Sequence, residues 1–311
     1  MDVLVINLNL AVDKTVLTEH LEKGRIYRFA ETLTAPGGKG VNAARALLAW
    51  GLKPKVAGFA SGLNGLWIAR ALKAEGLDAI LVKHNNGESR VCLSVIDAAG
   101  VATDFNEEGP VVPARAQAQL LQRVSSIAGG FRAVGVCGRV SAGLKKGFYG
   151  ELVSLARANG CFTAFDAGGW ALKEGLAAGA DAVKINRYEF EELSGRCFSA
   201  HTMAEFFKKS VQYGLKTLIV TDRANPSFAV SRFGLWRITP PKIQRLVSPV
   251  GAGDSFLAGF LTGFLNGFGF EKTLKLAAGF AASDCLSLGA GVIDKNCVIA
   301  FAEKALVKKI F

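Results

Sequence analysis

The chain has 311 residues, of which 50% are hydrophobic, and its formal net charge is +11. This length suits one large α/β domain or two smaller ones, each with a substantial buried core. No apolar run approaches the roughly 20 residues that a membrane-spanning helix needs. The lysines and arginines are dispersed, whereas nucleic-acid binding is typical of a clustered basic surface. We therefore expect neither a membrane nor a nucleic-acid partner.

The first ten residues and the cysteines point to the same cellular setting. Residues 1–10 form a short apolar stretch without a basic lead or a cleavage site, which predicts a strand and no signal peptide. The cysteines are Cys92, Cys137, Cys161, Cys197, Cys285 and Cys297. They are scattered and form no Cys-x-x-Cys pair, so reduced thiols in a cytoplasmic protein are expected, with no metal cage.

Short apolar, β-branched runs alternate along the chain with segments of helical spacing. The predicted core strands are Val3–Asn7, Lys55–Phe59, Ala79–Val82, Ala133–Cys137, Cys161–Asp166, Ala180–Ile185 and Thr217–Thr221. The predicted helices are Asn42–Trp50, Trp67–Glu75, Ala114–Ile127, Phe148–Ala158, Glu189–Leu193, Met203–Tyr213, Ser255–Asn266 and Lys272–Leu286. This alternation predicts one α/β domain, residues 1–311, with a doubly wound, mostly parallel sheet flanked by helices.

Two stretches interrupt this rhythm, at about residues 11–35 and 88–107. Both carry alternating patterns without an intervening helix, as in Arg90–Ile96, which is followed by the turn Asp97–Gly100. They predict antiparallel strands in a small sheet apart from the main one. Beside an α/β core, such a sheet is expected to form a lid over the site.

The most informative motif is Pro249–Ser255, PVGAGDS, which places two glycines and an acid just before an apolar run. This order predicts a tight turn that enters a helix, where backbone N–H groups can bind an anion such as phosphate. Asp254 would then lie beside the anion and accept a proton from an attacking hydroxyl. The alternative is a plain turn with a capping side chain, because Asp and Ser are favoured caps.

A second glycine cluster, Gly37–Asn42, leads into the helix predicted at residues 43–50. It is not a Walker A loop, because no Ser or Thr follows Lys39, and it lacks the dinucleotide-binding spacing Gly-x-Gly-x-x-Gly. Its Lys and Asn suit a small polyol or a phosphate, and the alternative is a glycine turn before a helix. Polar residues also end several predicted strands, namely Asn7, Asn9, Asp166, Asn186 and Thr221. Since ligands bind at the carboxyl ends of parallel strands, one cleft is expected to collect all of these groups.

Both glycine motifs, in this order, resemble the ribokinase-like PfkB family of carbohydrate kinases, and within it the branch of 1-phosphofructokinase and tagatose-6-phosphate kinase. The resemblance extends from about Val3 to Val292. It is carried further by Asn7–Asp13, Val41–Arg45, Glu88–Arg90, Thr103–Asn106 with Gly109-Pro110, Phe148–Val153 and Leu288–Val292.

This resemblance implies a role for each matching residue. Asp254 would be the catalytic base, and the N–H groups of Gly251, Ala252 and Gly253 would stabilise the moving phosphoryl group. The implied substrate-binding residues are Asp13, Gly37, Gly38 and Asn42 on the sugar, with Lys39, Arg28 and Arg90 on its phosphate. The implied nucleotide-binding residues are Lys184, Asn186, Thr221, Arg223, Gly253 and Ser283. Glu189 would act on Mg²⁺ through water.

The chain also departs from the family pattern at three places. Gly138-Arg139-Val140-Ser141 replaces Gly-Ser-Leu-Pro, so Arg139 is expected near the sugar site, as an extra phosphate ligand or as a group that narrows the pocket. Thr221–Pro226 replaces the nucleotide-facing loop Ser-Leu-Gly-x-x-Gly, and Asp222 in it would repel a triphosphate unless Arg223 or Mg²⁺ offsets it. Asp166–Gly169 replaces Asp-Thr-Ser-Gly.

The resemblance implies an enzyme that uses ATP and Mg²⁺ to phosphorylate a ketohexose phosphate. Fructose 1-phosphate, giving fructose 1,6-bisphosphate, is the first choice, followed by tagatose 6-phosphate and fructose 6-phosphate. A kinase for an unphosphorylated sugar or a nucleoside is an alternative, as is a catalytically silent sugar-phosphate-binding relative. A homodimer through the lid is the assembly that the resemblance suggests.

Overall fold

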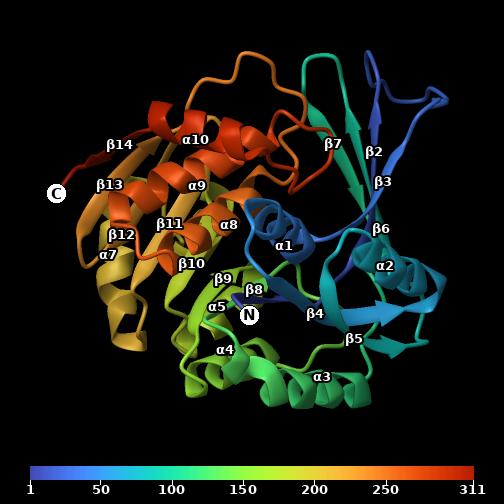
Figure 1. The fold of residues 1–311 in the computed structure, drawn as a ribbon, viewed down its shortest axis with the longest axis horizontal. Coiled ribbons are helices and arrows are strands. Elements are labelled where there is room, and N and C mark those ends of the chain that lie inside the picture. The colour runs from blue at the N-terminus through green and yellow to red at the C-terminus, as the bar shows by residue number, and fades with distance from the viewer.

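Ten strands form the main sheet of the computed structural model, which describes residues 1–311 (Figure 1). Their spatial order is β14 (Leu306–Lys309), β13 (Gly234–Thr239), β12 (Asn225–Ser231), β11 (Thr217–Asp222), β10 (Ala182–Asn186), β9 (Phe162–Asp166), β8 (Ala133–Cys137), β1 (Val3–Asn7), β4 (Pro54–Ser61) and β5 (Asp78–His84). The strands from β11 to β5 run parallel. The remaining strands, β12 to β14, continue the sheet as an antiparallel edge.

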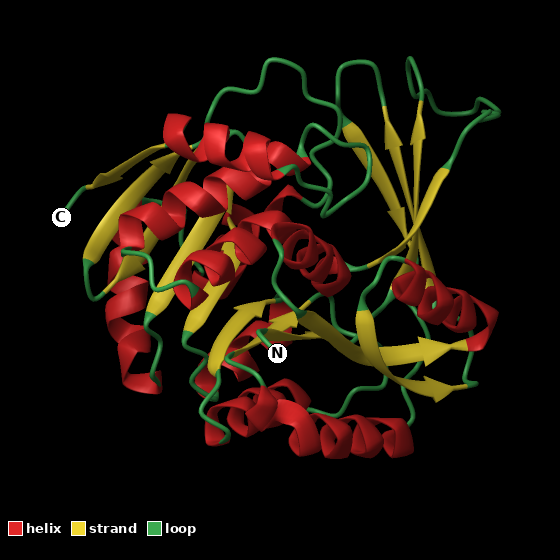
Figure 2. Ribbon diagram, in the orientation of Figure 1, coloured by secondary structure: helices red, strands yellow, loops and turns green.

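Helices cover both faces of this sheet, as Figure 2 shows. One face carries α3 (Ala114–Ile127), α4 (Phe148–Ala158), α5 (Gly169–Ala177), α6 (Arg187–Ser194) and α7 (Ala200–Ser210). The other carries α1 (Lys39–Trp50), α2 (Gly62–Ala74), α8 (Ala252–Leu265), α9 (Phe270–Asp284) and α10 (Lys295–Lys304). Successive side chains of strand β1 point to opposite faces of the sheet. Leu4 and Ile6 pack in the hydrophobic core on the face of α3 to α7, and Val3 and Val5 pack in the core on the face of α1 and α8.

The smaller sheet has the order β3 (Leu33–Gly37), β2 (Ala11–Leu17), β6 (Arg90–Ile96) and β7 (Ala102–Asn106). It stands apart from the main sheet in Figure 1. The expected antiparallel pairing holds for β2 with β3 and for β6 with β7. The central pair, β2 and β6, runs parallel, because each strand enters the lid from the core in the same direction. In that register Asp13 lies beside Cys92.

The predicted strand–helix alternation is confirmed, and every predicted core strand is present. The prediction omitted β12, β13 and β14, together with α5 and α10, and it started α1 at Asn42 where the helix begins at Lys39. The structure contains no helix that is both long enough and apolar enough to cross a bilayer.

Candidate active site

The turn that enters α8 leaves backbone donors without partners. Gly251 precedes the helix at φ 89°, and no side chain caps the helix, so the capping alternative for Asp254 and Ser255 is wrong. A Cβ at Gly251 would lie 2.5 Å from the Cβ of Ala290, so this close turn requires glycine. The N–H groups of Gly251 and Gly253 have no acceptor within the protein, whereas that of Ala252 donates to Pro249 O at 3.4 Å. Free donors at a helix N-terminus form an anion site.

Asp254 lies in the first turn of α8 and is 8% exposed. Its Oδ2 accepts a hydrogen bond from Asn42 Nδ2 at 2.8 Å, which brings together two residues 212 positions apart. Burial and the nearby carboxylate of Asp166 raise the pKa of Asp254 to about 7, against the lowering effect of Lys184, Lys39 and Asn42. A carboxylate with this pKa is suited to accept a proton near neutral pH.

Asp166, at the end of β9, is held between two lysines. Lys184 Nζ lies 2.6 Å from its Oδ2 and Lys39 Nζ lies 3.0 Å from its Oδ1. Burial alone would raise the pKa of Asp166, but the two lysines lower it overall, so the group is ionised. Lys184 also lies against the first turn of α8, because a Cβ at Gly253 would be 2.9 Å from its Nζ.

Glu189 joins this group from the start of α6. Asn186 caps that helix, its side chain accepting from Glu189 N at 2.9 Å, while Glu189 Oε2 accepts from Asn186 N at 2.9 Å. The other carboxylate oxygen, Oε1, lies 3.4 Å from Lys39 Nζ. The ammonium of Lys39 therefore lies between Asp166 and Glu189, and these acids raise its pKa although burial opposes them.

The α1 corner, Pro36–Asn42, uses its backbone donors internally. Gly40 N donates to Asn7 Oδ1 at 2.6 Å and Gly38 N donates to Asp13 Oδ2 at 3.3 Å. A Cβ at Gly37 would lie 1.9 Å from Asp13 Oδ2, so glycine is required for the close approach of this carboxylate. Burial raises the pKa of Asp13, although the Gly38 N–H and the nearby Arg90 and Arg45 act in the opposite direction.

Arg45 ties the two glycine corners together. Its Nη2 donates to Pro36 O and its Nη1 to Ala290 O, each at 2.6 Å. Its Nε donates to Glu75 Oε2 at 2.9 Å, which neutralises the guanidinium. Arg45 belongs to the Val41–Arg45 motif, but it is not among the predicted site residues.

Arg90 and Arg139 are two of the cations that the sequence analysis expects at the sugar phosphate. Arg90 in β6 is 8% exposed, and its Nε donates to Asn9 O at 3.4 Å. Arg139 lies two residues after the end of β8 and is exposed, and its side chain makes no hydrogen bond or ion pair. Asn9 connects both neighbourhoods, because its Nδ2 also donates to Val140 O at 3.3 Å.

Other predicted residues lie apart from this cluster. Arg28 is exposed in the loop between β2 and β3, at the opposite end of the lid from the paired residues Ala11 and Gly37, so it does not join the site of its own chain. Ser283 is buried in α9, where its hydroxyl accepts from Asp294 N at 3.0 Å and so ties α9 to α10.

The β11–β12 turn keeps its shape without glycine. Arg223 has φ 52°, the one positive value outside glycine, and its guanidinium lies 5.9 Å from the ring centroid of Tyr188. Asp222, which would repel a triphosphate unless a cation offsets it, forms an ion pair with Arg187 Nη1 at 3.7 Å. Thr221 Oγ1 donates to Ile185 O at 3.4 Å, which places it next to the end of β10.

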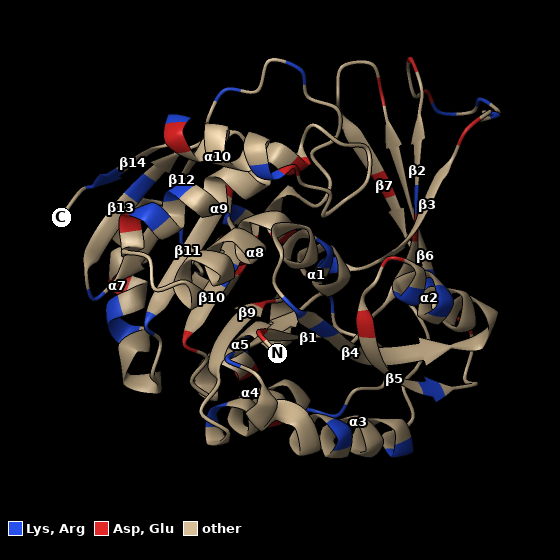
Figure 3. Ribbon diagram, in the orientation of Figure 1, with Lys and Arg blue, Asp and Glu red and all other residues tan.

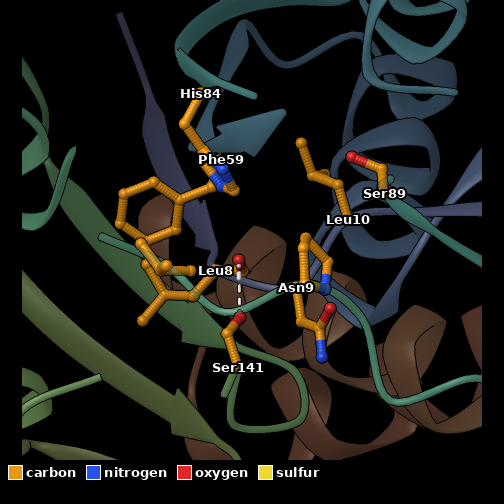
Figure 4. Close-up of a pocket in the computed structure, with 9 residues that line it drawn as sticks. Leu8, Asn9, Leu10, Phe59, His84, Ser89 and Ser141 are labelled. Carbon is orange, nitrogen blue, oxygen red and sulfur yellow. Dashed lines mark hydrogen bonds between the residues drawn. The ribbon is translucent and has the colours of Figure 1, made fainter. Parts of the chain in front are cut away.

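Two cavities lie outside the cluster of Asp254, Asp166 and Lys39. One of about 10 Å³, the size of a single water molecule, is lined by Asn9, His84 and Ser141 among others, and the Ser141 hydroxyl donates to Leu8 O at 2.9 Å (Figure 4). The other, of about 430 Å³, lies between α2 and the end of β5. Neither includes the predicted catalytic residues.

Free backbone donors at a glycine turn, a buried carboxylate and lysines at the carboxyl edge of a parallel sheet are the arrangement expected of a phosphotransferase with a ribokinase-like fold. A sequence model of the pfkB family carbohydrate kinases matches residues 3–296, so the chain belongs to that family. The 1-phosphofructokinase of Rhodobacter capsulatus is 30% identical over 309 residues, covering 98% of this chain and 97% of that one. The protein is thus a sugar-phosphate kinase.

Solved structures confirm the fold. A possible 1-phosphofructokinase of Thermotoga maritima superposes with a TM-score of 0.91 at 22% identity and covers all of both chains. Phosphofructokinase-2 of Escherichia coli, in complex with substrates and products, gives a TM-score of 0.89 at 22% identity, covering 97% of this chain and 99% of that chain.

Proposed function

We propose that this kinase transfers the γ-phosphoryl group of ATP to a ketohexose phosphate, with fructose 1-phosphate as the preferred acceptor and fructose 1,6-bisphosphate as the product. One observation carries the proposal. The buried carboxylate of Asp254, with its pKa of about 7, lies in the same helical turn as the free N–H groups of Gly251 and Gly253. A base and an anion site in one turn are what a phosphoryl transfer to an alcohol needs.

In this mechanism Asp254 accepts the proton of the acceptor hydroxyl as its oxygen bonds to phosphorus. Asn42 holds the carboxylate in place through the 2.8 Å hydrogen bond. The N–H groups of Gly251 and Gly253 donate to the phosphoryl oxygens, whose negative charge increases towards the transition state. Ala252 adds less, because its N–H already has a long bond to Pro249 O.

Asp13, with the backbone at Gly37 and Gly38, would bind the sugar hydroxyls from the lid side. The buried Asp13 carboxylate has spare acceptor positions, and its place on β2 links sugar binding to the lid. Arg90 and Arg139 would bind the phosphate already on the sugar, for which a guanidinium fork is well suited. In a homodimer through the lid, Arg28 of one chain would serve the site of the other.

Lys184 and Lys39 would bind the phosphates of the donor nucleotide. Both ammonium groups contact Asp166, so Lys39 is better placed for the donor phosphates than for the sugar phosphate that the sequence suggested. Thr221, Asn186 and Arg223 border the same edge, and a cationic Arg223 would replace the missing glycines of the loop. Ser283 takes no part in this proposal, because its hydroxyl is engaged by Asp294.

Mg²⁺ fits this site only through water. No three acidic, His or Cys side chains converge in a way that could hold a metal ion, and one oxygen of Glu189 is used by the Asn186 N–H. Glu189 would therefore hold water on the ion, as expected of a cation that dehydrates reluctantly. When bound, Mg²⁺ would neutralise charge on the donor phosphates.

The choice of acceptor rests on the relatives. The name of the Rhodobacter capsulatus relative favours fructose 1-phosphate, whereas the structures of Escherichia coli phosphofructokinase-2 include a complex with fructose 6-phosphate. Tagatose 6-phosphate is the third candidate. A free sugar or a nucleoside is disfavoured, because Arg90 and Arg139 would then lack a phosphate partner.

A coupled assay of ADP release tests the proposal, with ATP·Mg²⁺ and a panel of fructose 1-phosphate, tagatose 6-phosphate, fructose 6-phosphate, fructose and ribose. We expect turnover with fructose 1-phosphate at the highest kcat/KM. Turnover with free sugars alone would overturn the role of the two arginines. Absence of turnover with every acceptor and nucleotide would favour the silent binding protein.

A further inference from the structure

Asp284, at the end of α9, is a buried acid that the mechanism above does not use. Its side chain is fully buried. Oδ2 accepts from the hydroxyl of Ser255 at 2.9 Å, and Oδ1 accepts from Val292 N at 2.9 Å. The Gly291 N–H also points to this carboxyl group. Asp284 thus connects α8, directly after the base, to the loop that packs against Gly251.

Asp284 lies next to the turn that carries the free N–H groups. A Cβ at Gly251 would lie 2.8 Å from Asp284 Oδ2. A full negative charge there would oppose the charge that the Gly251 and Gly253 N–H groups are meant to stabilise. The same oxygen as a neutral acid would leave the anion site intact.

No cation compensates Asp284. It takes part in no ion pair, unlike Asp166 with its two lysines. The charged group that faces it from α8 is the carboxylate of Asp254, and its neighbour on α9 is the thiol of Cys285. On the side of α1, Arg45 reaches Ala290 O but is paired with Glu75, and on the side of α10 the Asp294 carboxylate accepts from Cys297 N.

We propose that Asp284 is a positioning residue that works as a neutral carboxylic acid next to the anion site, and that its ionisation weakens phosphoryl transfer. As an acid it keeps the contact with the Ser255 hydroxyl and accepts from the Val292 N–H, which fixes the start of α8 against the 289–292 loop. Loss of its proton to solvent places a full negative charge next to Gly251. Burial raises the pKa of Asp284 to about 8, and the Asp254 carboxylate acts in the same direction. The proposal rests on the function proposed above.

The kinetic test is the pH profile of kcat in the wild type and in Asp284→Asn. The wild type is expected to rise with the ionisation of Asp254 near pH 7 and to fall about tenfold per pH unit above pH 8. Asp284→Asn is expected to have a lower kcat than the wild type, but its kcat should not fall above pH 8. The matched control is Asp181→Asn. Asp181 is also a buried acid, but its carboxylate lies 2.7 Å from Lys216 Nζ, and it precedes β10 at the end of that strand away from the active site. This variant should keep the fall in kcat above pH 8.

A second measurement does not need activity and so separates this proposal from the proposed function. The free energy of unfolding is measured against pH for the wild type and for Asp284→Asn. Because the folded pKa lies above the unfolded one, the wild type loses stability as pH rises from about 4 to 8. The advantage of the variant should therefore grow over this interval and stay constant above it. Should Asp284→Asn fail to fold, Ser255→Ala serves instead, and it should move the alkaline fall to higher pH, because the Ser255 hydroxyl lowers the pKa of Asp284.

Two results would overturn the proposal. One is an alkaline fall that persists unchanged in Asp284→Asn, or a stability difference that does not depend on pH. The other is a wild type whose activity and stability drop when K⁺ is replaced by tetramethylammonium while the variant is unaffected, since Asp284 would then be an ionised ligand of a small cation. Absence of turnover in the wild type, with the stability difference intact, would contradict the proposed function and leave the neutral acid supported.

Discussion

The two glycine corners of this kinase look alike in sequence but treat their backbone donors in opposite ways. Both enter a helix through a glycine of positive φ, Gly38 at 104° and Gly251 at 89°, and neither helix has a side-chain cap. At the α1 corner, Asn7 and Asp13 accept the N–H groups. At the α8 corner, the N–H groups of Gly251 and Gly253 remain free. The first corner therefore holds a side chain in place, and the second is left open for a ligand.

This difference is decided by what lies opposite each corner. The end of β1 and the start of the lid bring two polar side chains onto the α1 corner. The α8 corner faces the Asp166–Lys184 pair, which offers donors and no free acceptor. The glycine motifs alone do not show which corner has free N–H groups. Because the two corners differ in this way, substitutions in them should have different effects on kcat and KM.

The largest effect should come from Asp254→Asn. The amide keeps the shape and the contact with Asn42 but cannot accept the proton, so kcat should fall by about 10³-fold. ADP release at saturating acceptor measures the loss. Sugar-phosphate affinity, measured by calorimetry, should stay within a few fold, and a variant with full activity would show that another group is the base.

Gly253→Ala should lower kcat by about 100-fold. The position is helical and tolerates alanine, but the new methyl would lie 2.9 Å from Lys184 Nζ, where it crowds the anion site. Single-turnover kinetics should show a slower chemical step with little change in the KM for the sugar. Activity equal to that of the wild type would mean that the added methyl group does not crowd a bound phosphoryl group.

The Asp254→Asn variant should also be more stable than the wild type. Because the folded pKa of Asp254 is raised to about 7, the wild type loses stability as pH rises from about 4 to 7. Removing the charge should raise the free energy of unfolding by about 4 kcal/mol above pH 8 and change it little below pH 4. Urea unfolding at both pH values tests this, and an equal gain at each would point to packing instead of charge.

At the α1 corner, Gly37→Ala should act mainly on binding. The added methyl would displace the Asp13 carboxylate, from which it would be only 1.9 Å away. The KM for the sugar phosphate should rise about tenfold, the size of effect expected when one charged hydrogen bond is lost, while kcat changes less. A fall in kcat that matched Gly253→Ala would remove the distinction between the two corners.

Arg139→Ser should have the smallest effect. The side chain is exposed and unpaired, so its attraction for the sugar phosphate is screened, and KM should rise about threefold. The increase should shrink with added salt. An unchanged KM at low salt would exclude Arg139 from the substrate site.

The parallel sheet was predictable because its strands are buried on both faces and alternate with helices along the chain. The strands β12 to β14 were not predicted, because β12 contains Pro226, β13 has only two buried residues and β14 has only four residues. Asp166 was noticed as a polar strand end, but its partner Lys39 is 127 residues away, and no local pattern encodes that contact. Figure 3 shows how dispersed the charged residues are over the elements, so sequence gives little guidance to such pairs.

The environment of Asp284 could not be predicted from the sequence. It stands at the end of a helix whose other residues are mainly small and apolar, and a single acid there reads as a surface residue near a helix end. Only the fold shows that its side chain is buried against Ser255 and the 291–292 turn. The proposed base and the proposed anion site, in contrast, adjoin each other in the sequence and were predicted together.

In the proposed donor site, the left-handed backbone conformation of Arg223 affects the entropy of nucleotide binding. An arginine at φ 52° costs about 1 kcal/mol more than a glycine in the folded state, but an arginine also has fewer backbone conformations to lose when the turn forms. The β11–β12 turn should therefore be more rigid than a glycine-containing loop and already ordered before a nucleotide arrives. Less ordering on binding means that fewer contacts with the donor are needed for the same affinity.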